Sequence, residues 1–324
     1  MRTVALVAGL LLAVLALAAC ETDAAGESVP AASKPAPVDL ADGRPLRVVA
    51  TIGQIADAVR HVGGDRVEVQ GLMGSGVDPH LYRASESDIT RLESADAVFW
   101  NGLHLEAGMS GVLERMVDLG VHSIRVTDHI DRTRLLAPPE FDGAYDPHVW
   151  FDLDLWSTAV ESIRDALVAM DPEGAEAYRA NAAAYIAEIA ELDMYVKARA
   201  QEIEERVRVL ITAHDAFNYF ANRYGMQVRG LQGISTESEA STADVQELAR
   251  FISERGIPAV FIESSVPDQG VQAVIEAAAA RGHTVTIGGE IFSDAMGAEG
   301  TEEGTYLGMI RHNIDTIVAA LRKA

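Results

Sequence analysis

The sequence predicts an α/β protein of two lobes, each a mostly parallel sheet flanked by helices, joined by a single long α-helix. Short apolar runs alternate with helical segments in both halves of the 324-residue chain, which is the pattern of parallel sheets. Residues 175–206, between the two halves, contain neither proline nor glycine. Hydrophobic residues make up 48% of the chain and charged residues 23%, so a chain of this length can bury two cores.

The N-terminal residues predict export. Arg2 precedes an apolar run over residues 4–19, which is shorter than the about 20 residues of a membrane-spanning helix. The run ends in Leu-Ala-Ala-Cys, and Cys20 is the only cysteine. We expect residues 1–20 to be a lipoprotein signal peptide, with a lipid anchor at Cys20 that holds the protein to the membrane, on the outer face of the cytoplasmic membrane or in the periplasm. Residues 21–45, rich in Ala, Pro and Ser, are expected to form a flexible tether. The alternative is an ordinary secretory signal with an incidental cysteine.

Strands and helices alternate through the first predicted lobe, residues 46–174. LRVVATIGQIADAVRHVGG indicates a buried strand, a turn at Gly53 and a helix that closes at Gly63–Gly64. VEVQGLM is the next strand, SESDITRLESA a helix opened by Ser85, and ADAVFWNG a strand followed by a turn. After VHSIRVTDHI and a Pro-Pro break, a helix follows YDPHVW and ends at Asp171.

Residues 175–206 predict the linking helix. They are rich in Ala, Glu, Lys and Arg, which are strong helix formers. At 1.5 Å per residue such a helix would be roughly 50 Å long, more than one small domain needs. A coiled-coil arm is the alternative, but the apolar positions do not sustain heptads with flanking charge pairs. A rigid strut between two lobes is therefore the favoured interpretation.

The second predicted lobe, residues 207–324, repeats the alternation without an obvious sequence repeat. VRVLITAH indicates a buried strand, DAFNYFANRYG a helix, and MQVRGLQG a strand. TADVQELARFISERG is helical, IPAVFIESSV a strand, DQGVQAVIEAAAARG a helix and HTVTIGG the last strand. TEEGTYLGMIRHNIDTIVAALRKA closes the chain as an amphipathic helix.

The charge balance excludes one class of partner. The chain has 49 acidic and 26 basic residues, for a formal net charge of -23. A nucleic-acid backbone would be repelled, so we expect no nucleic-acid partner. A cationic ligand is a better match, although acidity also serves solubility.

Four side chains at strand ends or in turns are candidate metal ligands, because ligands of open α/β sheets bind beyond the carboxyl ends of the strands. His80 and His148 each follow a proline in an Asp-Pro-His tripeptide, and the proline restricts the turn before the imidazole. His214 ends the strand VRVLITAH, and Asp294 follows the last strand. Three imidazoles and one carboxylate suit zinc and keep manganese possible.

The spacing of these residues forms no local metal motif, so the fold must assemble the site. A single histidine is more often a surface residue or a support for a ligand than a ligand. Glu263, Glu290 and Asp215 compete with Asp294 for the role of the carboxylate ligand. The remaining histidines are expected to be structural or solvated: His61, His104, His122, His129, His283 and His312.

These candidates lie in stretches that resemble the metal-binding receptors of bacterial manganese and zinc ABC importers, the cluster with a long helix between two lobes. The stretches cover nearly the whole chain from Leu46 onward: VGGDRVEVQGLMGSGVDPHLYRASESDITRLESADAVFWNGLHLE, DPHVWFDL, ITAHDAFNYFANRYGM, GISTESEASTADV, VFIESSV, GGEIFSDAMG and GTYLGMIRHN. Any one of them is weak alone, but their combination and order are highly specific.

The resemblance implies which residues bind the ion. The first ligand of that family lies in a P-H-x-Y-x-x-x-x-S-D pattern, which here contains His80, and the second lies in D-P-H-x-W, which contains His148. The third position is histidine or glutamate in different members and is His214 here, and the fourth aligns with Asp294. The chain lacks the His-rich acidic loop that zinc-specific relatives often carry after the first ligand.

The implied function is that of an extracytoplasmic receptor, not an enzyme, which binds one zinc or manganese ion between its lobes and delivers it to an ABC transporter membrane permease. We expect a monomer, and only modest rearrangement on loading because the long helix resists a wide hinge. A secreted zinc-dependent hydrolase is the main alternative, since three protein ligands and an open position would activate a water molecule. A surface protein of cell adhesion with an incidental metal is a third.

Overall fold

The structure, a computed structural model, describes residues 35–141 and 143–322. The predicted signal peptide over residues 1–20, the predicted anchor Cys20 and residues 21–34 of the predicted tether lie outside these ranges. Within them, no helix combines the length and the apolar character that crossing a membrane would require.

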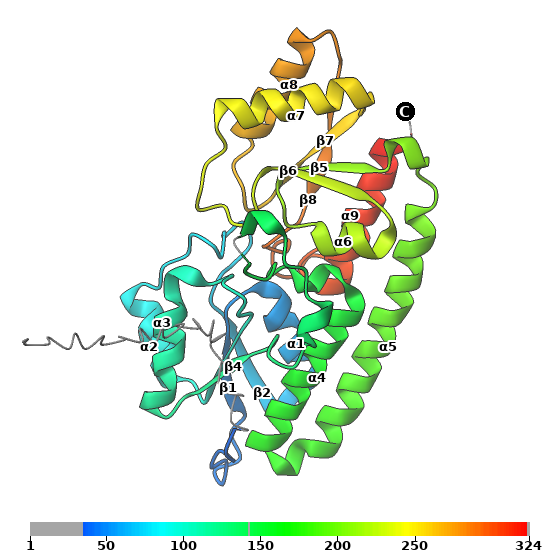
Figure 1. Cartoon of the computed structure of the whole chain (residues 1–324). Coiled ribbons are helices and arrows are strands. Elements are labelled where there is room, and N and C mark those ends of the chain that lie inside the picture. The colour runs from blue at the N-terminus through cyan, green and yellow to red at the C-terminus, as the bar shows by residue number, and fades with distance from the viewer. Residues whose placement is uncertain (1–34, 142, 323–324) are drawn as a thin grey trace, which may run out of the picture. The chain divides into compact units, whose positions relative to one another are not determined.

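A four-stranded parallel sheet in the order β2-β1-β3-β4 forms the first half (Figure 1). Val48 of the interior strand β1 pairs with Val69 of β2 on one side and with Ala97 of β3 on the other. The helix start predicted at Ser85 is confirmed, because this side chain caps α2 by accepting from the Asp88 N–H. The strands are β1 Leu46–Ala50, β2 Val67–Gly71, β3 Ala97–Trp100 and β4 His122–Arg125; the helices are α1 Gly53–Gly63, α2 Glu86–Ser94 and α3 Ser110–Arg115.

Two long helices, α4 (Leu153–Met170) and α5 (Ala175–Ala200), follow the first sheet and lie side by side. The range predicted for the linking helix, residues 175–206, is wrong at its C-terminal end. After Ala200 the chain turns back toward β5: Ile203 is buried, and its carbonyl accepts from the Arg208 guanidinium at 2.8 Å. With 26 residues, α5 is about 39 Å long.

The second half contains two parallel strand pairs, β5-β6 and β7-β8, with β5 beside β7. The predicted α/β class with parallel sheets flanked by helices is therefore confirmed. The last strand begins at Thr286 and not at His283, because the His283 N–H still donates to the Ala278 carbonyl at the end of α8. The strands are β5 Val209–His214, β6 Gln227–Gln232, β7 Ala259–Glu263 and β8 Thr286–Ile291; the helices are α6 Asn218–Tyr224, α7 Thr242–Arg255, α8 Gln269–Ala280 and α9 Tyr306–Leu321.

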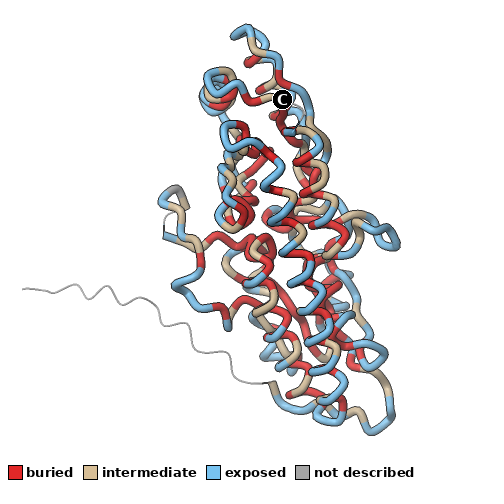
Figure 2. The backbone as a smooth tube through the Cα atoms, turned by 90° about the vertical axis from the view of Figure 1, so that its right-hand side faces the viewer, coloured by how far each residue is buried: buried red, intermediate tan, exposed pale blue. Residues whose placement is uncertain are grey.

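The main hydrophobic core is shared by the two halves. It contains side chains of the first sheet and of α1, α4, α5, α6 and α9, whereas a second cluster lies between β5, β7 and the helices α7 and α8. The buried side of α5 repeats every three or four residues, so this helix packs along its length (Figure 2). Asp57 of α1 accepts from the Tyr185 hydroxyl of α5 at 2.8 Å and from the Tyr306 N–H of α9 at 3.2 Å. The last helix is thus fixed to the first half.

The predicted flexible tether over residues 21–45 is wrong for residues 35–45. Val38 and Leu40 pack against the main core, and the Val38 N–H donates to the Met170 carbonyl at 2.8 Å. Arg44 forms an ion pair with the carboxylate of Asp96, which precedes β3. Residues 35–45 are therefore docked on the fold by two apolar side chains and one ion pair, despite the Ala/Pro/Ser-rich composition of the segment.

Candidate metal centre

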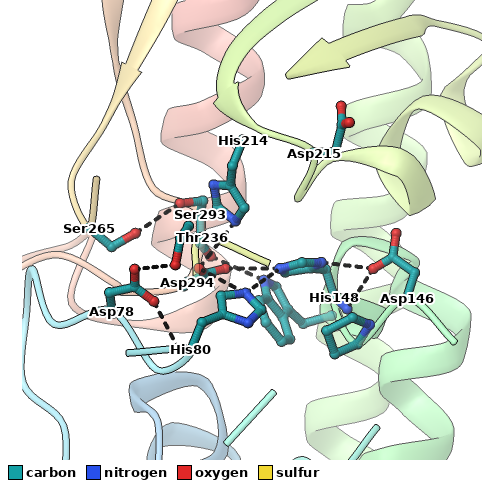
Figure 3. A network of polar contacts seen from close by, with 12 residues as sticks. Asp78, His80, Asp146, His148, His214, Asp215, Thr236, Ser265, Ser293 and Asp294 are labelled. Atoms are coloured by element: carbon teal, nitrogen blue, oxygen red, sulfur yellow. Dashed lines mark hydrogen bonds and ion pairs between the residues drawn. The ribbon is translucent and has the colours of Figure 1, made fainter. Parts of the chain in front are cut away.

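The four predicted ligands converge on one buried point between the two halves (Figure 3). Each of His80, His148, His214 and Asp294 offers a ligand atom, and all four atoms lie within 4.8 Å of one another. The Nε2 atoms of His80 and His148 are 3.3 Å apart, and the Nε2 of His214 is 3.2 Å from an Asp294 oxygen. Tetrahedral zinc with bonds of 2.0–2.1 Å would hold its ligand atoms about 3.3 Å apart. The cluster therefore has the dimensions of a single-ion site.

The two Asp-Pro-His tripeptides place their histidines through the aspartate as well as through the proline. In each, the carboxylate accepts from the histidine N–H two residues later, at 2.9 Å for Asp78 and His80 and at 3.0 Å for Asp146 and His148. Asp146 also accepts from the Nδ1 of His148 at 2.7 Å. A carboxylate only accepts, so this bond puts the ring hydrogen on Nδ1 and leaves Nε2 facing the cluster.

Glu263 gives His214 the same support from a neighbouring strand. His214 is the last residue of β5, and Glu263 is the last residue of β7. One Glu263 oxygen accepts from the His214 N–H at 2.9 Å, and the other lies 2.6 Å from Nδ1. Glu263 and Asp215 were both candidates for the carboxylate ligand. Glu263 instead orients a histidine, and the side chain of Asp215 lies away from the cluster (Figure 3).

Asp294 is held by its main chain, which leaves its carboxylate free for the cluster. Gln54 of α1 donates to the carbonyls of Ser293 and Asp294 at 3.3 and 3.1 Å, and the Trp150 indole donates to Ser293 at 3.2 Å. Both carboxylate oxygens of Asp294 and the Nε2 of His214 are buried without a hydrogen-bond partner among the described residues. Such unpaired buried atoms are costly unless a cation satisfies them.

Burial and neighbouring charges shift the pKa values of the four side chains in different directions. Burial lowers the pKa of His80 to about 3, so this imidazole is neutral at external pH. Burial also opposes charge on His148, but the carboxylates of Asp146 and Asp294 outweigh it and raise its pKa to about 9. Against the same burial, Glu263 and Asp294 raise the pKa of His214 well above its usual value. Burial would raise the pKa of Asp294, yet the two histidines hold it well below its usual range.

The six histidines expected to be structural or solvated are not part of the cluster. His61 stacks on Tyr185, and its Nδ1 lies 2.9 Å from the Asp57 carbonyl. The Nε2 atoms of His283 and His312 lie 2.7 and 3.0 Å from the carbonyls of Ile257 and Glu290. Sequence reasoning missed four supporting residues: Asp78, Asp146, Gln54 and Thr236, whose hydroxyl donates to Asp78 at 2.6 Å. A signal existed for the two aspartates, since each stands inside its ligand's tripeptide, and Thr236 lies in GISTESEASTADV, one of the stretches that carry the resemblance. None existed for Gln54.

The fold and its buried cluster define the class of two-lobed metal-binding proteins. The chain belongs to the family of periplasmic zinc-uptake complex component A proteins (ZnuA), whose sequence model matches residues 48–320. It is 47% identical over 318 residues to the manganese-binding lipoprotein MntA of Bacillus subtilis, covering 98% of this chain and 99% of that protein.

Similarity to a second relative extends to its solved structure. The chain is 50% identical over 283 residues to the zinc-binding protein TroA of Treponema pallidum, covering 87% of this chain and 91% of TroA. The structure of periplasmic TroA superposes on this chain with a TM-score of 0.83 at 49% identity, covering 86% of this chain and 99% of that structure. The α/β architecture described above is thus that of a solved relative.

Proposed function

We propose that the protein is an extracytoplasmic receptor that binds one zinc or manganese ion through His80, His148, His214 and Asp294 and delivers it to an ABC transporter permease. The observation that carries this proposal is the set of buried, unpaired ligand atoms at the cluster. One divalent cation would satisfy all of them at once.

The choice between the two metals depends on the carboxylate. Three imidazoles favour zinc by ligand type and by the Irving–Williams order. Both oxygens of Asp294 face the histidines, one 3.3 Å from the Nε2 of His148 and the other 3.2 Å from that of His214. A carboxylate that offers both oxygens raises the number of donors and so also suits manganese. MntA and TroA, named for manganese and for zinc, are similarly close to this chain.

The proposal includes the location and assembly of the protein. Residues 1–20 would direct export, and the lipidated Cys20 would hold a monomer at the outer face of the cytoplasmic membrane, where it meets the permease. Relatives named as lipoproteins support this. The lobes would comprise residues 46–174 and 207–324, joined by α5. Because α5 and α9 pack in the core that both halves share, we propose a modest rearrangement on loading.

A secreted zinc hydrolase finds no support in the family to which the chain belongs, and four protein donors facing one point would leave little room for a reactive water. An adhesin with an incidental metal would not need the two carboxylates that orient His148 and His214.

Native mass spectrometry of the metal-free protein, titrated with zinc and then with manganese, tests the proposal. We expect one ion per chain, a loss of affinity of more than about 100-fold in His148→Ala, and no change in His122→Ala, a histidine of β4 outside the cluster. Deleting the gene should lower cellular uptake of the bound metal. A wild-type protein that takes up no ion, or a deletion strain with unchanged uptake, would refute the receptor function.

A further inference from the structure

The four side chains of the proposed site are not attached to the molecule in the same way. Asp294 belongs by sequence to the second half, but two side chains of the first half hold the main chain there: Gln54 donates to the Asp294 carbonyl and Trp150 to the Ser293 carbonyl. His80 and His148 lie in turns of the first half. His214 alone extends from a strand whose side chains Val209, Ile211 and Ala213 pack in the second cluster with α7 and α8. An ion at this point therefore joins a shared core to a separately packed sheet.

Of the four ligands, His80 is the one with an exposed neighbour in the chain. The relative exposures are 2% for His80, 0% for His148 and His214, and 1% for Asp294, and the next residue along the chain, Leu81, is 55% exposed. The turn that carries His80 is thus the part of the site wall nearest to solvent. Moving this turn would open the site without disturbing the buried supports of His148, His214 and Asp294.

A side chain of the second half fastens this turn from outside. One oxygen of Asp78 accepts from the His80 N–H at 2.9 Å, and the other accepts from the Thr236 hydroxyl at 2.6 Å (Figure 3). Thr236 lies in the segment between β6 and α7 and is only 6% exposed, whereas the residues that follow it, Glu237 and Ser238, are exposed. The turn also rests on the second half at Gly76, where an added Cβ would lie 3.4 Å from the Ser264 carbonyl oxygen.

We infer that Thr236 is a positioning residue for metal exchange, whose hydroxyl acts through Asp78 to hold the His80 turn across the exit of the site. The inference rests on the proposed function of the cluster as a metal site. While the hydrogen bond is made, Asp78 joins the His80 main chain to the second half, so the turn cannot swing outward. The ion leaves after this bond breaks, and the bond must form again when the site closes.

The bond is expected to affect rates more than affinity. A hydrogen bond to a charged group shifts an equilibrium by about tenfold or more. The bond between Thr236 and Asp78 is made in the closed site and broken in the open one. A substitution that removes this bond therefore raises the rate of opening, and both the entry and the departure of the ion become faster. Thr236 contacts neither the ion nor an imidazole, so the ligand set is unchanged.

Stopped-flow mixing of the zinc-loaded protein with excess chelator measures the rate at which zinc dissociates. Thr236→Val removes the hydroxyl at nearly constant volume and should raise the zinc dissociation rate about tenfold, with a smaller change in Kd. Thr236→Ser keeps the hydroxyl and should restore the wild-type rate within about twofold. Thr133→Val is the matched control, because it removes a hydroxyl bond to the carboxylate of Asp131 at 2.8 Å on an exposed turn.

Asp78→Asn provides an independent second variant should Thr236→Val not fold, and it should also speed dissociation. In the double variant the two effects should not add, because both act on one bond. Wild-type rates in Thr236→Val, or equally fast release from Thr236→Ser, would overturn the inference while leaving the receptor function intact. A wild-type protein that binds no zinc would instead refute the function itself.

Discussion

Metal binding at neutral pH should release two protons per ion. In the metal-free protein His80 is already neutral, since its pKa is about 3, whereas the pKa of His148 is about 9 and that of His214 is raised well above 6.5. These raised pKa values predict that at pH 7.5 the last two are imidazolium ions, which face the carboxylate of Asp294. A cation at the cluster needs the lone pairs of both Nε2 atoms, so it displaces both Nε2 protons, while the Nδ1 protons stay on the two rings and are donated to Asp146 and Glu263.

The magnitude follows from the number of protons. Two released protons make the apparent association constant rise about 100-fold for each pH unit below the pKa values of the two histidines, or about 2.7 kcal/mol. The affinity therefore falls as the pH falls. Calorimetric titration with zinc in buffers of different ionisation enthalpy gives the proton count directly as the slope of observed enthalpy against buffer enthalpy.

We expect a slope that corresponds to two protons at pH 7.5. In Glu263→Gln the carboxylate that raises the pKa of His214 is lost, so the count should fall toward one. A count near zero in the wild-type protein would show that all three imidazoles are neutral before the ion arrives. That result would show that the paired carboxylates do not raise the pKa values of His148 and His214.

Three further predictions follow from single contacts. Asp146→Asn removes the charge behind His148 and should weaken metal binding about 10- to 100-fold, measured by chelator competition against the surface control Asp131→Asn. Tyr185→Phe deletes the buried hydroxyl that bonds to Asp57 and should lower the free energy of unfolding in urea by about 1–3 kcal/mol. The raised pKa of His148 stabilises the metal-free protein by roughly 3 kcal/mol below pH 6.5. This contribution should disappear as the pH rises through 9, as pH-dependent unfolding of the metal-free protein would show; constant stability from pH 6.5 to 9.5 would contradict it.

The sequence was sufficient to predict most of the fold, because the elements are marked locally. Ser85 caps α2 and the Gly63–Gly64 pair ends α1 where their residue types predict it. The end of α5 could not be predicted in this way, since residues 201–206 have helical composition and are turned by the burial of Ile203. The docking of residues 35–45 likewise depends on partners distant in sequence, Met170 and Asp96.

The roles of Gln54 and Glu263 at the site could not be predicted either, because these residues too are distant in sequence from the residues they contact. Spacing alone left each candidate histidine uncertain, and only the resemblance to a family selected the set that the structure brings together. Gln54 and Asp294 are separated by 240 positions in the chain, so their contact has no local signature. Glu263 was visible as a carboxylate at a strand end, but its role depends on which strand neighbours β5. Residue types indicate the chemistry of such a site, and strand order decides which residue binds and which one orients.

The two Asp-Pro-His tripeptides show how one local structure can serve two purposes. In both, proline and the aspartate carboxylate place the histidine N–H before any ion is bound. The further carboxylate contacts then differ. The Asp146 oxygen that accepts from the His148 N–H also accepts from the ring Nδ1 and so fixes the direction of Nε2, while its other oxygen accepts from the Asn218 amide. The second oxygen of Asp78 instead accepts from the Thr236 hydroxyl on the other half. A receptor that must hold an ion and later release it needs one ligand that does not move and one that can. The contact of Asp146 with the imidazole ring assigns the fixed role to His148, and His80, whose aspartate bonds to the Thr236 hydroxyl instead, has the movable role.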